Sequence, residues 1–245
     1  VLKAGRVMVL VAGCSTNRAE WAWIRAAKAT GTSSAMMIDI GIGTCLDDVD
    51  PIDAPDTFLV TNERCVRELE EKGFRADRVR VTGNPYLESL ANSVEDKRRL
   101  AEVPRAYGVD PGRAIISMFL PPEGLPDGVI DHVHALLEDS SLKDWVMIVR
   151  PHPRTGGDET VQARNACDPF SDVVWDGERV VDTTSLLGAS LCSLTLGSTV
   201  SAESWALGVP SAFFQIGWDY GELDDLYRNL DRIPRLRSPE AFHRF

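Results

Sequence analysis

The sequence lacks the main features of membrane-spanning, secreted and nucleic-acid-binding proteins. Its 245 residues contain no apolar run of about 18 residues, the length that a membrane-spanning helix needs. The first residues have neither the apolar segment nor the small-residue cleavage site of a signal peptide. Only 26 residues are basic against 37 acidic ones, and the net charge of -11 argues against a protein that binds the phosphate backbone of nucleic acids.

Cysteine is scarce and shows no paired pattern. The five cysteines form no CxxC motif and are odd in number, so neither a disulfide framework nor a thiolate zinc site is predicted. Free thiols suit a reducing compartment, and we expect a cytoplasmic protein. Hydrophobic residues make up 44% of the chain, enough for a sizeable core, and the length fits one large or two small domains.

Short β-branched runs alternate with helical stretches along almost the whole chain. The predicted strands cover residues 6–12, 34–39, 57–61, 79–82, 114–120, 146–150, 173–175, 192–196 and 211–215. The predicted helices cover residues 19–30, 63–72, 128–137, 159–166, 199–207 and 222–229. Because consecutive parallel strands need a crossover helix, this alternation predicts an α/β protein with doubly wound parallel sheets.

The alternation breaks once, in a polar and charged stretch that we interpret as a connecting helix or linker. It covers residues 86–112 and separates an N-terminal domain, residues 1–85, from a C-terminal domain, residues 113–245. The first domain has about four predicted strands, fewer than a complete doubly wound sheet. We therefore expect that domain to be truncated at its N-terminus.

The strongest candidate site follows the predicted strand 192–196. Gly197 has no side chain and lets a ligand approach the backbone, and Ser198 is placed to cap the next helix. The free N–H groups of that first turn suit a phosphate. Thr199 and Glu203 are four residues apart and share one helix face, where a carboxylate can accept hydrogen bonds from both hydroxyls of a ribose. A plain capped helix with a solvated Glu203 is the alternative.

Positive charge gathers in the loop after the predicted strand 146–150. The sequence Arg-Pro-His-Pro-Arg runs from Arg150 to Arg154, and its two prolines fix the path of the chain around His152. Guanidinium groups suit a diphosphate, and a histidine can donate to a phosphoryl oxygen or transfer a proton. A surface loop with a histidine packed on proline rings is the alternative. We favour the functional interpretation, because ligands bind beyond the carboxyl ends of parallel strands.

The order of three motifs resembles the GT-B superfamily. The motifs are Val-Thr-Gly-Asn-Pro at 81–85, Arg-Pro-His-Pro at 150–153, and Gly-Ser-Thr-Val-Ser-Ala-Glu at 197–203, which Leu-Gly-Val-Pro at 207–210 follows. That superfamily includes nucleotide-sugar glycosyltransferases and the non-hydrolysing UDP-N-acetylglucosamine 2-epimerases. The paired His-Pro and Ser/Thr motifs are also similar to those of bacterial sialyltransferases and capsule transferases. The resemblance implies two Rossmann-like domains, with the nucleotide held by the C-terminal one.

The resemblance, together with the chemistry of the residues, suggests a function. The expected nucleotide and phosphate contacts are Arg150, His152, Arg154, Gly197, Ser198, Thr199 and Glu203. We expect a glycosyltransferase of polysaccharide biosynthesis or a related pathway, which moves a sugar or similar group to a glycan, lipid or metabolite acceptor. Its donor would be a nucleotide sugar of the UDP or the CMP/CDP type. A sugar-nucleotide epimerase or hydrolase, and a non-catalytic nucleotide- or sugar-binding relative, are the alternatives.

Carboxylates of the first domain are candidates for the base that deprotonates an acceptor hydroxyl. We single out Glu20 and Asp39, which with His152 form the predicted catalytic set. No metal or further cofactor is expected, because cationic side chains and a helix dipole can balance the phosphate charge. Gly41 and Gly43 do not indicate an NAD site, since an acidic loop follows them. A sheet edge left by missing strands would need covering, so a homodimer is considered.

Overall fold

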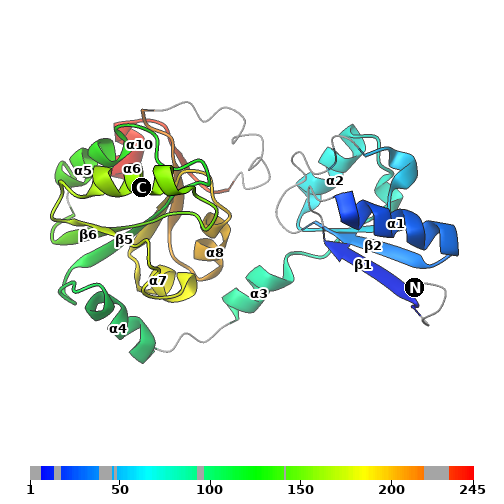
Figure 1. Cartoon of the computed structure of the whole chain (residues 1–245), viewed down its shortest axis with the longest axis horizontal. Helices are drawn as coiled ribbons and strands as arrows, with labels where there is room; N and C mark the ends of the chain where they lie inside the picture. Colours follow the sequence, from blue (N-terminus) through cyan, green and yellow to red (C-terminus); the bar gives the residue numbers. More distant parts are fainter. Residues whose placement is uncertain are drawn as a thin grey trace. The chain divides into compact units, whose positions relative to one another are not determined.

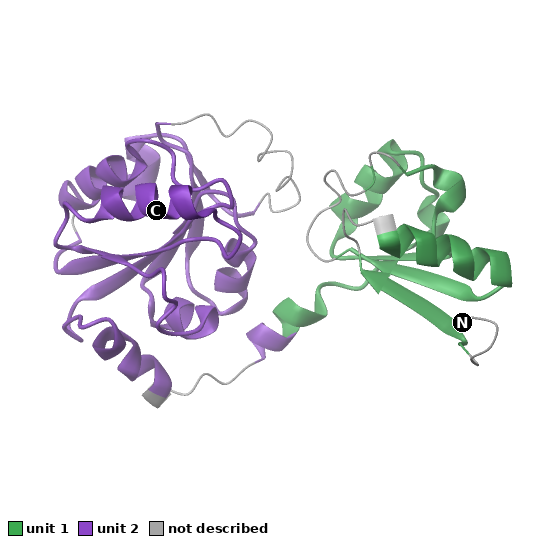
Figure 2. Ribbon diagram, viewed as in Figure 1, with its two compact units in different colours: residues 1–88, 221–231 green, residues 89–220, 232–245 purple. Residues whose placement is uncertain are grey.

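The structure is a computed structural model that describes residues 7–13, 18–38, 46, 49–92, 97–140, 142–217 and 232–245 (Figure 1). The chain divides into two compact units (Figure 2). Unit 1 contains residues 1–88 and 221–231, and unit 2 contains residues 89–220 and 232–245. The boundary between residues 88 and 89 falls within helix α3 (Pro85–Ala91), in the segment that the sequence assigns to a linker.

Unit 1 is a parallel four-stranded sheet with helices. Its described elements are β1 (Val9–Gly13), α1 (Arg18–Thr30), β2 (Ser33–Met37), the 3-10 helix Pro51–Asp53, β3 (Thr57–Val60), α2 (Glu63–Glu71), the 3-10 helix Ala76–Arg78 and β4 (Val79–Val81). The strands follow chain order, β1-β2-β3-β4, and every pair is parallel. Trp21 and Ile24 of α1 and Leu69 of α2 pack with Phe58 and Met36 of the sheet in one buried cluster.

The first strand is less buried than its apolar sequence predicts. Val9 and Val11 are 54% and 61% exposed, and the strand begins three residues later than expected. The physical reason is position: β1 is the edge strand of the sheet, paired only with β2 among the described strands. A run of β-branched residues predicts a strand but does not tell a central strand from an edge strand.

Unit 2 is a doubly wound parallel sheet of six strands. Its described elements are α4 (Lys97–Ala106), β5 (Ala114–Phe119), α5 (Val129–Glu138), β6 (Trp145–Arg150), α6 (Gly157–Cys167), β7 (Val173–Trp175), α7 (Thr183–Ala189), β8 (Cys192–Thr195), α8 (Val200–Ala206), β9 (Ser211–Phe214), β10 (Arg235–Leu236) and α10 (Pro239–Arg244). The strand order is β10-β9-β8-β5-β6-β7, and all the pairs are parallel. The predicted α/β class, with two Rossmann-like parallel sheets, is confirmed.

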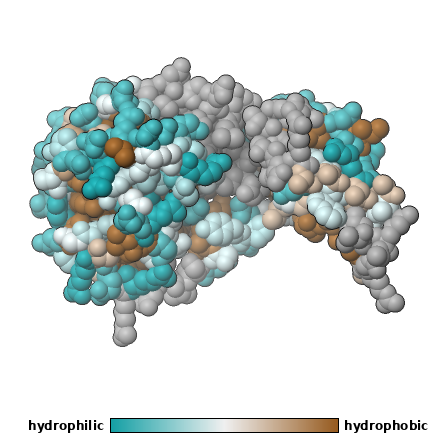
Figure 3. All heavy atoms as spheres, in the orientation of Figure 1, coloured by the Kyte–Doolittle hydropathy of each residue, from teal (hydrophilic) through white to brown (hydrophobic). Residues whose placement is uncertain are grey.

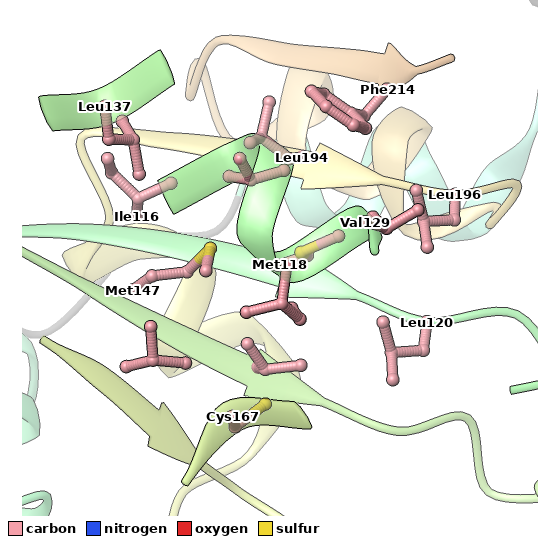
Figure 4. Packing of buried hydrophobic residues seen from close by; sticks show 14 of the residues in the cluster. Ile116, Met118, Leu120, Val129, Leu137, Met147, Cys167, Leu194, Leu196 and Phe214 are labelled. Atoms are coloured by element: carbon pink, nitrogen blue, oxygen red, sulfur yellow. The ribbon is translucent and has the colours of Figure 1, made fainter. Parts of the chain in front are cut away.

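Alternate residues of β5 enter two different cores, which shows that helices cover both faces of this sheet. Ile116 and Met118 pack with residues of α5 and α6 (Figure 4), and the same cluster contains Phe242 of α10. Ile115 and Phe119 pack on the opposite face, with residues of α4 and α7. Burial on both faces explains why the predicted strands of this unit read as continuous apolar runs.

The strand and helix predictions agree with the structure to within a residue or two at most described positions. The sequence did not predict β10 and α10, because a strand of two residues carries no alternating pattern. The predicted helix 222–229 lies outside the described residues. The polar segment 86–112 contains most of α3 and all of α4, and α4 packs on α7 of unit 2 through the buried Val103.

On the face drawn in Figure 3, hydrophobic residues are interspersed with hydrophilic ones. Among the described residues, no helix combines the length and hydropathy that crossing a bilayer requires. Three cysteines lie in the described part of the chain, and all three are free thiols.

Candidate functional site

The order of strands in unit 2 marks one place on the sheet for a ligand. From β5 the chain moves outward through β6 and β7, and it then returns to the other side of β5 with β8 and β9. The order therefore reverses between β5 and β8. In open α/β sheets, ligands bind at the carboxyl ends of the strands beside such a reversal.

Two of the predicted loops leave the sheet on either side of β5. Phe119, the last residue of β5, pairs with Arg150 of β6 and with Thr195 of β8. His152 and Gly197 each follow two residues after these partners. β6 and β8 are the two neighbours of β5, so they lie about 10 Å apart. A diphosphate with its attached groups can bridge that distance. The structure thus brings the two predicted motifs to one edge of the sheet.

The loop after β8 turns sharply before α8. Gly197 has a φ of 112°, a conformation that residues with a side chain rarely adopt. The hydroxyl of Ser198, a residue only 7% exposed, accepts the N–H of Val200 at 3.3 Å. Thr199 is the half-buried N-cap residue, one position later than predicted, and its side chain makes no capping hydrogen bond. Glu203 is half-buried in the first turn of α8, four residues after Thr199.

The loop after β6 fixes the tautomer of a histidine. Nδ1 of the half-buried His152 accepts the backbone N–H of Arg154 at 3.1 Å, and its carbonyl accepts the N–H of Thr155 at 3.0 Å. In the neutral ring the proton therefore sits on Nε2. Burial lowers the pKa of His152 below 6.5, and the charges of Arg154 and Arg179 lower it further, against the opposing effect of Glu123. His152 is thus a neutral N–H donor at pH 7.

Arg150 occupies a different environment from the one that the sequence predicts. Its side chain is 3% exposed and its Nε lies 2.6 Å from Oδ2 of Asp176, whose side chain is fully buried. The remaining donors reach the hydroxyl of Tyr107 at 3.0 Å, the carbonyl of Val181 at 2.7 Å and the hydroxyl of Thr183 at 3.3 Å. Four hydrogen bonds inside the protein hold the buried guanidinium, and this geometry indicates a structural role rather than the predicted phosphate contact.

A cation that the sequence analysis missed lies near His152. Arg179 is exposed, and its Nη2 donates to the carbonyl of Pro151 at 3.5 Å. Its φ of 52° is uncommon for a residue other than glycine and marks local backbone strain. Arg154, also exposed, acts on the same imidazole. No sequence signal points to Arg179, because only the fold brings the loop after β7 beside the loop after β6.

In unit 1, Glu20 lies at the carboxyl end of β1. It belongs to the first turn of α1, and its Oε1 lies 3.7 Å from the position that a Cβ on Gly13 would occupy. Its Oε2 is buried and has no hydrogen-bond partner within the described ranges. A buried carboxylate oxygen without a partner is uncommon in folded proteins. Asp39, Gly41 and Gly43 lie outside the described residues.

No family model and no curated protein matches the chain. Solved structures do. A UDP-GlcNAc 2-epimerase from Methanocaldococcus jannaschii, in complex with UDP-GlcNAc and UDP, is 14% identical with a TM-score of 0.66, over 99% of this chain and 69% of that one. The epimerase from Neisseria meningitidis bound to UDP-GlcNAc is 14% identical with a TM-score of 0.66, over 99% and 68%. The wall teichoic acid polymerase TagF is 12% identical with a TM-score of 0.52, over 98% and 79%.

The chain spans about two thirds of the length of these epimerases. Identities of this size establish the fold, and the resemblance predicted from three short motifs is confirmed at that level. The chain has the α/β fold of GT-B-type nucleotide-sugar proteins, with two Rossmann-like parallel sheets.

Proposed function

We propose that unit 2 binds the nucleotide of an activated sugar, and that the chain is part of an enzyme that transfers the sugar to an acceptor. The observation that carries the proposal is the placement of two loops. The loops of His152 and Gly197 leave the sheet on either side of β5, at the reversal of strand order. This is where α/β sheets with this winding hold their ligands.

His152 is proposed to hold the diphosphate. Its Nε2–H is free to donate because Nδ1 already accepts the N–H of Arg154. When the bond between sugar and phosphate breaks, negative charge develops on the departing nucleotide, and a fixed donor stabilises that charge without reorganisation. Arg154 and Arg179 add positive charge beside the imidazole. Arg150 is not a proposed phosphate contact, because its buried guanidinium bonds Asp176 and Val181 inside the protein.

The loop after β8 is proposed to receive the rest of the nucleotide. Gly197 presents backbone without a side chain, and Ser198 and Thr199 offer hydroxyl groups at the start of α8. Glu203 follows one turn later on the same helix, where its carboxylate suits the two hydroxyls of a ribose. For the nucleotide we propose UDP first, because the similar epimerase and the HepE protein of Anabaena were solved with UDP. CMP or CDP is the second choice.

Deprotonation of the acceptor is proposed for a carboxylate of unit 1. Glu20 is the candidate among the described residues, because one of its oxygens is buried and lacks a hydrogen-bond partner there. Asp39, which the sequence also indicates, is the second candidate for this base. Glu20→Gln is expected to abolish turnover while leaving the affinity for UDP unchanged, since unit 2 alone is proposed to hold the nucleotide.

The direct test is a calorimetric titration of the 245-residue chain with UDP, CDP and CMP. His152→Ala should weaken binding of the preferred nucleotide by about tenfold or more, as expected for a hydrogen bond to a charged group. His243→Ala is the matched control, since His243 lies on α10, with its Nε2 3.9 Å from Oδ2 of Asp139, and belongs to neither loop. If no nucleotide binds, or if His152→Ala binds as tightly as the parent, the proposed site is wrong.

Sugar epimerisation is a second candidate, favoured by one observation: several similar structures are UDP-GlcNAc 2-epimerases, with higher TM-scores than TagF. The two reactions are separated by incubating the chain with UDP-GlcNAc and no acceptor. Proton NMR would then show a second UDP-sugar for an epimerase, and free sugar with UDP for a hydrolase. A transferase would leave the donor intact until an acceptor is added. Nucleotide binding without turnover under any of these conditions would indicate a non-catalytic relative.

A further inference from the structure

Three side chains with metal-binding atoms converge in unit 2, away from the loops of His152 and Gly197. They are His134 and Glu138 of α5 and Asp172, which directly precedes β7. One ligand atom from each lies within 4.8 Å of the other two. His134 and Glu138 are four residues apart, so they share one face of the helix.

The imidazole of His134 is held in place by two aromatic neighbours. It stacks on Phe170, with ring centroids 4.3 Å apart and planes 27° from parallel. It also meets Trp145 edge to face, with centroids 5.4 Å apart. Two packed faces leave the ring little freedom to turn, and a ligand that is already oriented loses less entropy on binding a metal ion.

Asp172 is oriented by an ion pair of its own. Its Oδ1 accepts from Arg113 at 2.5 Å, and the same guanidinium reaches the carbonyl of Trp145. This contact leaves Oδ2 of Asp172 available to a cation. Ligating carboxylates are typically hydrogen-bonded by such neighbours. Glu138 is exposed and makes no ion pair within the described part of the chain, so it can rotate toward a metal ion.

The charge and chemistry of the cluster favour a transition metal. Two carboxylates against one guanidinium leave a net negative charge on these side chains, and the imidazole of His134 adds a nitrogen ligand. One nitrogen with two oxygens suits Zn²⁺ better than Mg²⁺ or Ca²⁺, which prefer oxygen alone. Ligand atoms around tetrahedral Zn²⁺ lie about 3.4 Å apart, so small side-chain rotations would close the present spacing.

The cluster lies at the edge of the sheet opposite to the nucleotide loops. Asp172 precedes the first residue of β7, and Trp145 begins β6, whereas His152 follows the last residue of β6. The distance along β6 from Trp145 to Arg150 is about 16 Å. A metal ion here is therefore too far away to contact a phosphate bound beside His152.

We propose that His134, Glu138 and Asp172 form a binding site for a divalent transition-metal ion, with Zn²⁺ as the best-matched ion. Three protein ligands leave a fourth position for water. The ion links the last turn of α5 to the segment that enters β7, and it stabilises unit 2 without taking part in nucleotide chemistry.

The experiment is a calorimetric titration of the chelator-treated chain with ZnCl₂, run in parallel with thermal unfolding. The parent is expected to bind one Zn²⁺ at this site and to unfold at a higher temperature when loaded. Glu138→Gln and His134→Gln should each weaken this binding by about tenfold or more. Glu138 is exposed, so its substitution tests the site even if His134→Gln disturbs the aromatic packing.

His132→Gln and Asp131→Asn are the matched controls, because both residues are exposed on the same helix. Unchanged Zn²⁺ binding in these two, with loss in the two ligand variants, supports the site. Absence of saturable Zn²⁺ binding by the parent would overturn it. Equal binding by the parent and the Glu138→Gln and His134→Gln variants would overturn it too, since the ion then lies elsewhere. His152→Ala is expected to leave Zn²⁺ binding unchanged.

Discussion

Arg150 and Asp176 form a buried ion pair across the carboxyl ends of the neighbouring strands β6 and β7, with Nε and Oδ2 2.6 Å apart. Oδ1 of Asp176 also accepts the N–H of Val180 at 2.9 Å. The pair therefore joins the start of the loop that carries His152 to the loop that carries Arg179. It joins two loops that the sequence separates by a whole crossover, together with the contacts of Arg150 to Val181 and Thr183 and of Arg179 to Pro151.

Breaking this pair is expected to destabilise unit 2 strongly. Arg150→Met leaves the Asp176 carboxylate buried without its cation, which should cost about 3–5 kcal/mol in the free energy of unfolding. The double variant Arg150→Met/Asp176→Asn should recover much of that loss, because no uncompensated charge remains. Urea unfolding of the parent, the single variant and the double variant measures both effects.

Arg105→Met is the control for this series. Arg105 pairs with Glu102 on α4, and both side chains are largely exposed. An ion pair in that setting contributes little, so stability should hardly change. A double variant as unstable as Arg150→Met would show that lost packing, rather than buried charge, dominates.

Arg150 shows which parts of the site could be predicted from the sequence and which could not. The apolar run before it correctly predicts β6, and the order of such runs predicts the parallel sheet. The sequence around Arg150 does not indicate its partner Asp176, which lies 26 residues later. The two side chains meet only because β7 pairs with β6. The same crossover brings Arg179 toward His152. Long-range pairs of this kind depend on topology, and local pattern does not encode them.

Features that depend on local chemistry were predicted better. Asn62 caps α2 and Asp182 caps α7, and local sequence can indicate such caps because a cap joins residues two or three positions apart. Gly197 also lies in the loop after β8, where the sequence predicts it. Local sequence could not indicate the exposure of Val9 and Val11 in β1, because being at an edge is a property of the whole sheet.

The pKa of His152 should lie below 6.5, because burial and the neighbouring cations Arg154 and Arg179 all disfavour the imidazolium. Protonation of Nδ1 would also break the hydrogen bond from the N–H of Arg154. The contribution of His152 to stability is therefore fully present above pH 6.5 and declines as the pH falls through the lower pKa of the folded state. An NMR titration of the four histidines measures this pKa directly.

Two variants separate the causes of that shift. Arg179→Ala should raise the pKa of His152 toward 6.5, and Glu123→Gln should lower it further. Arg179→Ala also removes the hydrogen bond to the carbonyl of Pro151, so Glu123→Gln, whose effect on the pKa has the opposite sign, is the check that charge is the cause. A pKa that does not respond to Arg179→Ala would mean that Arg179 lies too far from the imidazole to share a ligand with it.

Gly197→Ala is expected to destabilise unit 2 and to displace the loop after β8. The φ of 112° at this position is strained for any residue with a side chain, and such strain costs about 1–3 kcal/mol. UDP affinity should fall as well if the loop forms part of the proposed site. Gly157→Ala is the control: a Cβ there meets nothing within 4 Å, and the position begins α6. That change should be neutral or slightly stabilising.

Asn62→Ala tests unit 1 independently of any ligand. The side-chain oxygen of Asn62 accepts the N–H groups of Arg64 at 3.0 Å and Cys65 at 3.2 Å, two of the donors that a helix start leaves without partners. Loss of such a cap costs about 1 kcal/mol. Amide hydrogen exchange at Arg64 and Cys65 should therefore become faster, and the stability of unit 1 should fall by that amount.

The conservative variant Asn62→Ser decides whether the cap is the cause. A serine hydroxyl can accept the same N–H groups, so this variant should keep both the slow exchange and most of the stability. The exchange of unit 2 amides in α7, capped by Asp182, should stay unchanged in both variants, because that helix belongs to the other unit. Equal losses in Asn62→Ala and Asn62→Ser would instead assign the effect to other contacts of the asparagine, such as the one from its amide to the hydroxyl of Thr61 at 3.4 Å.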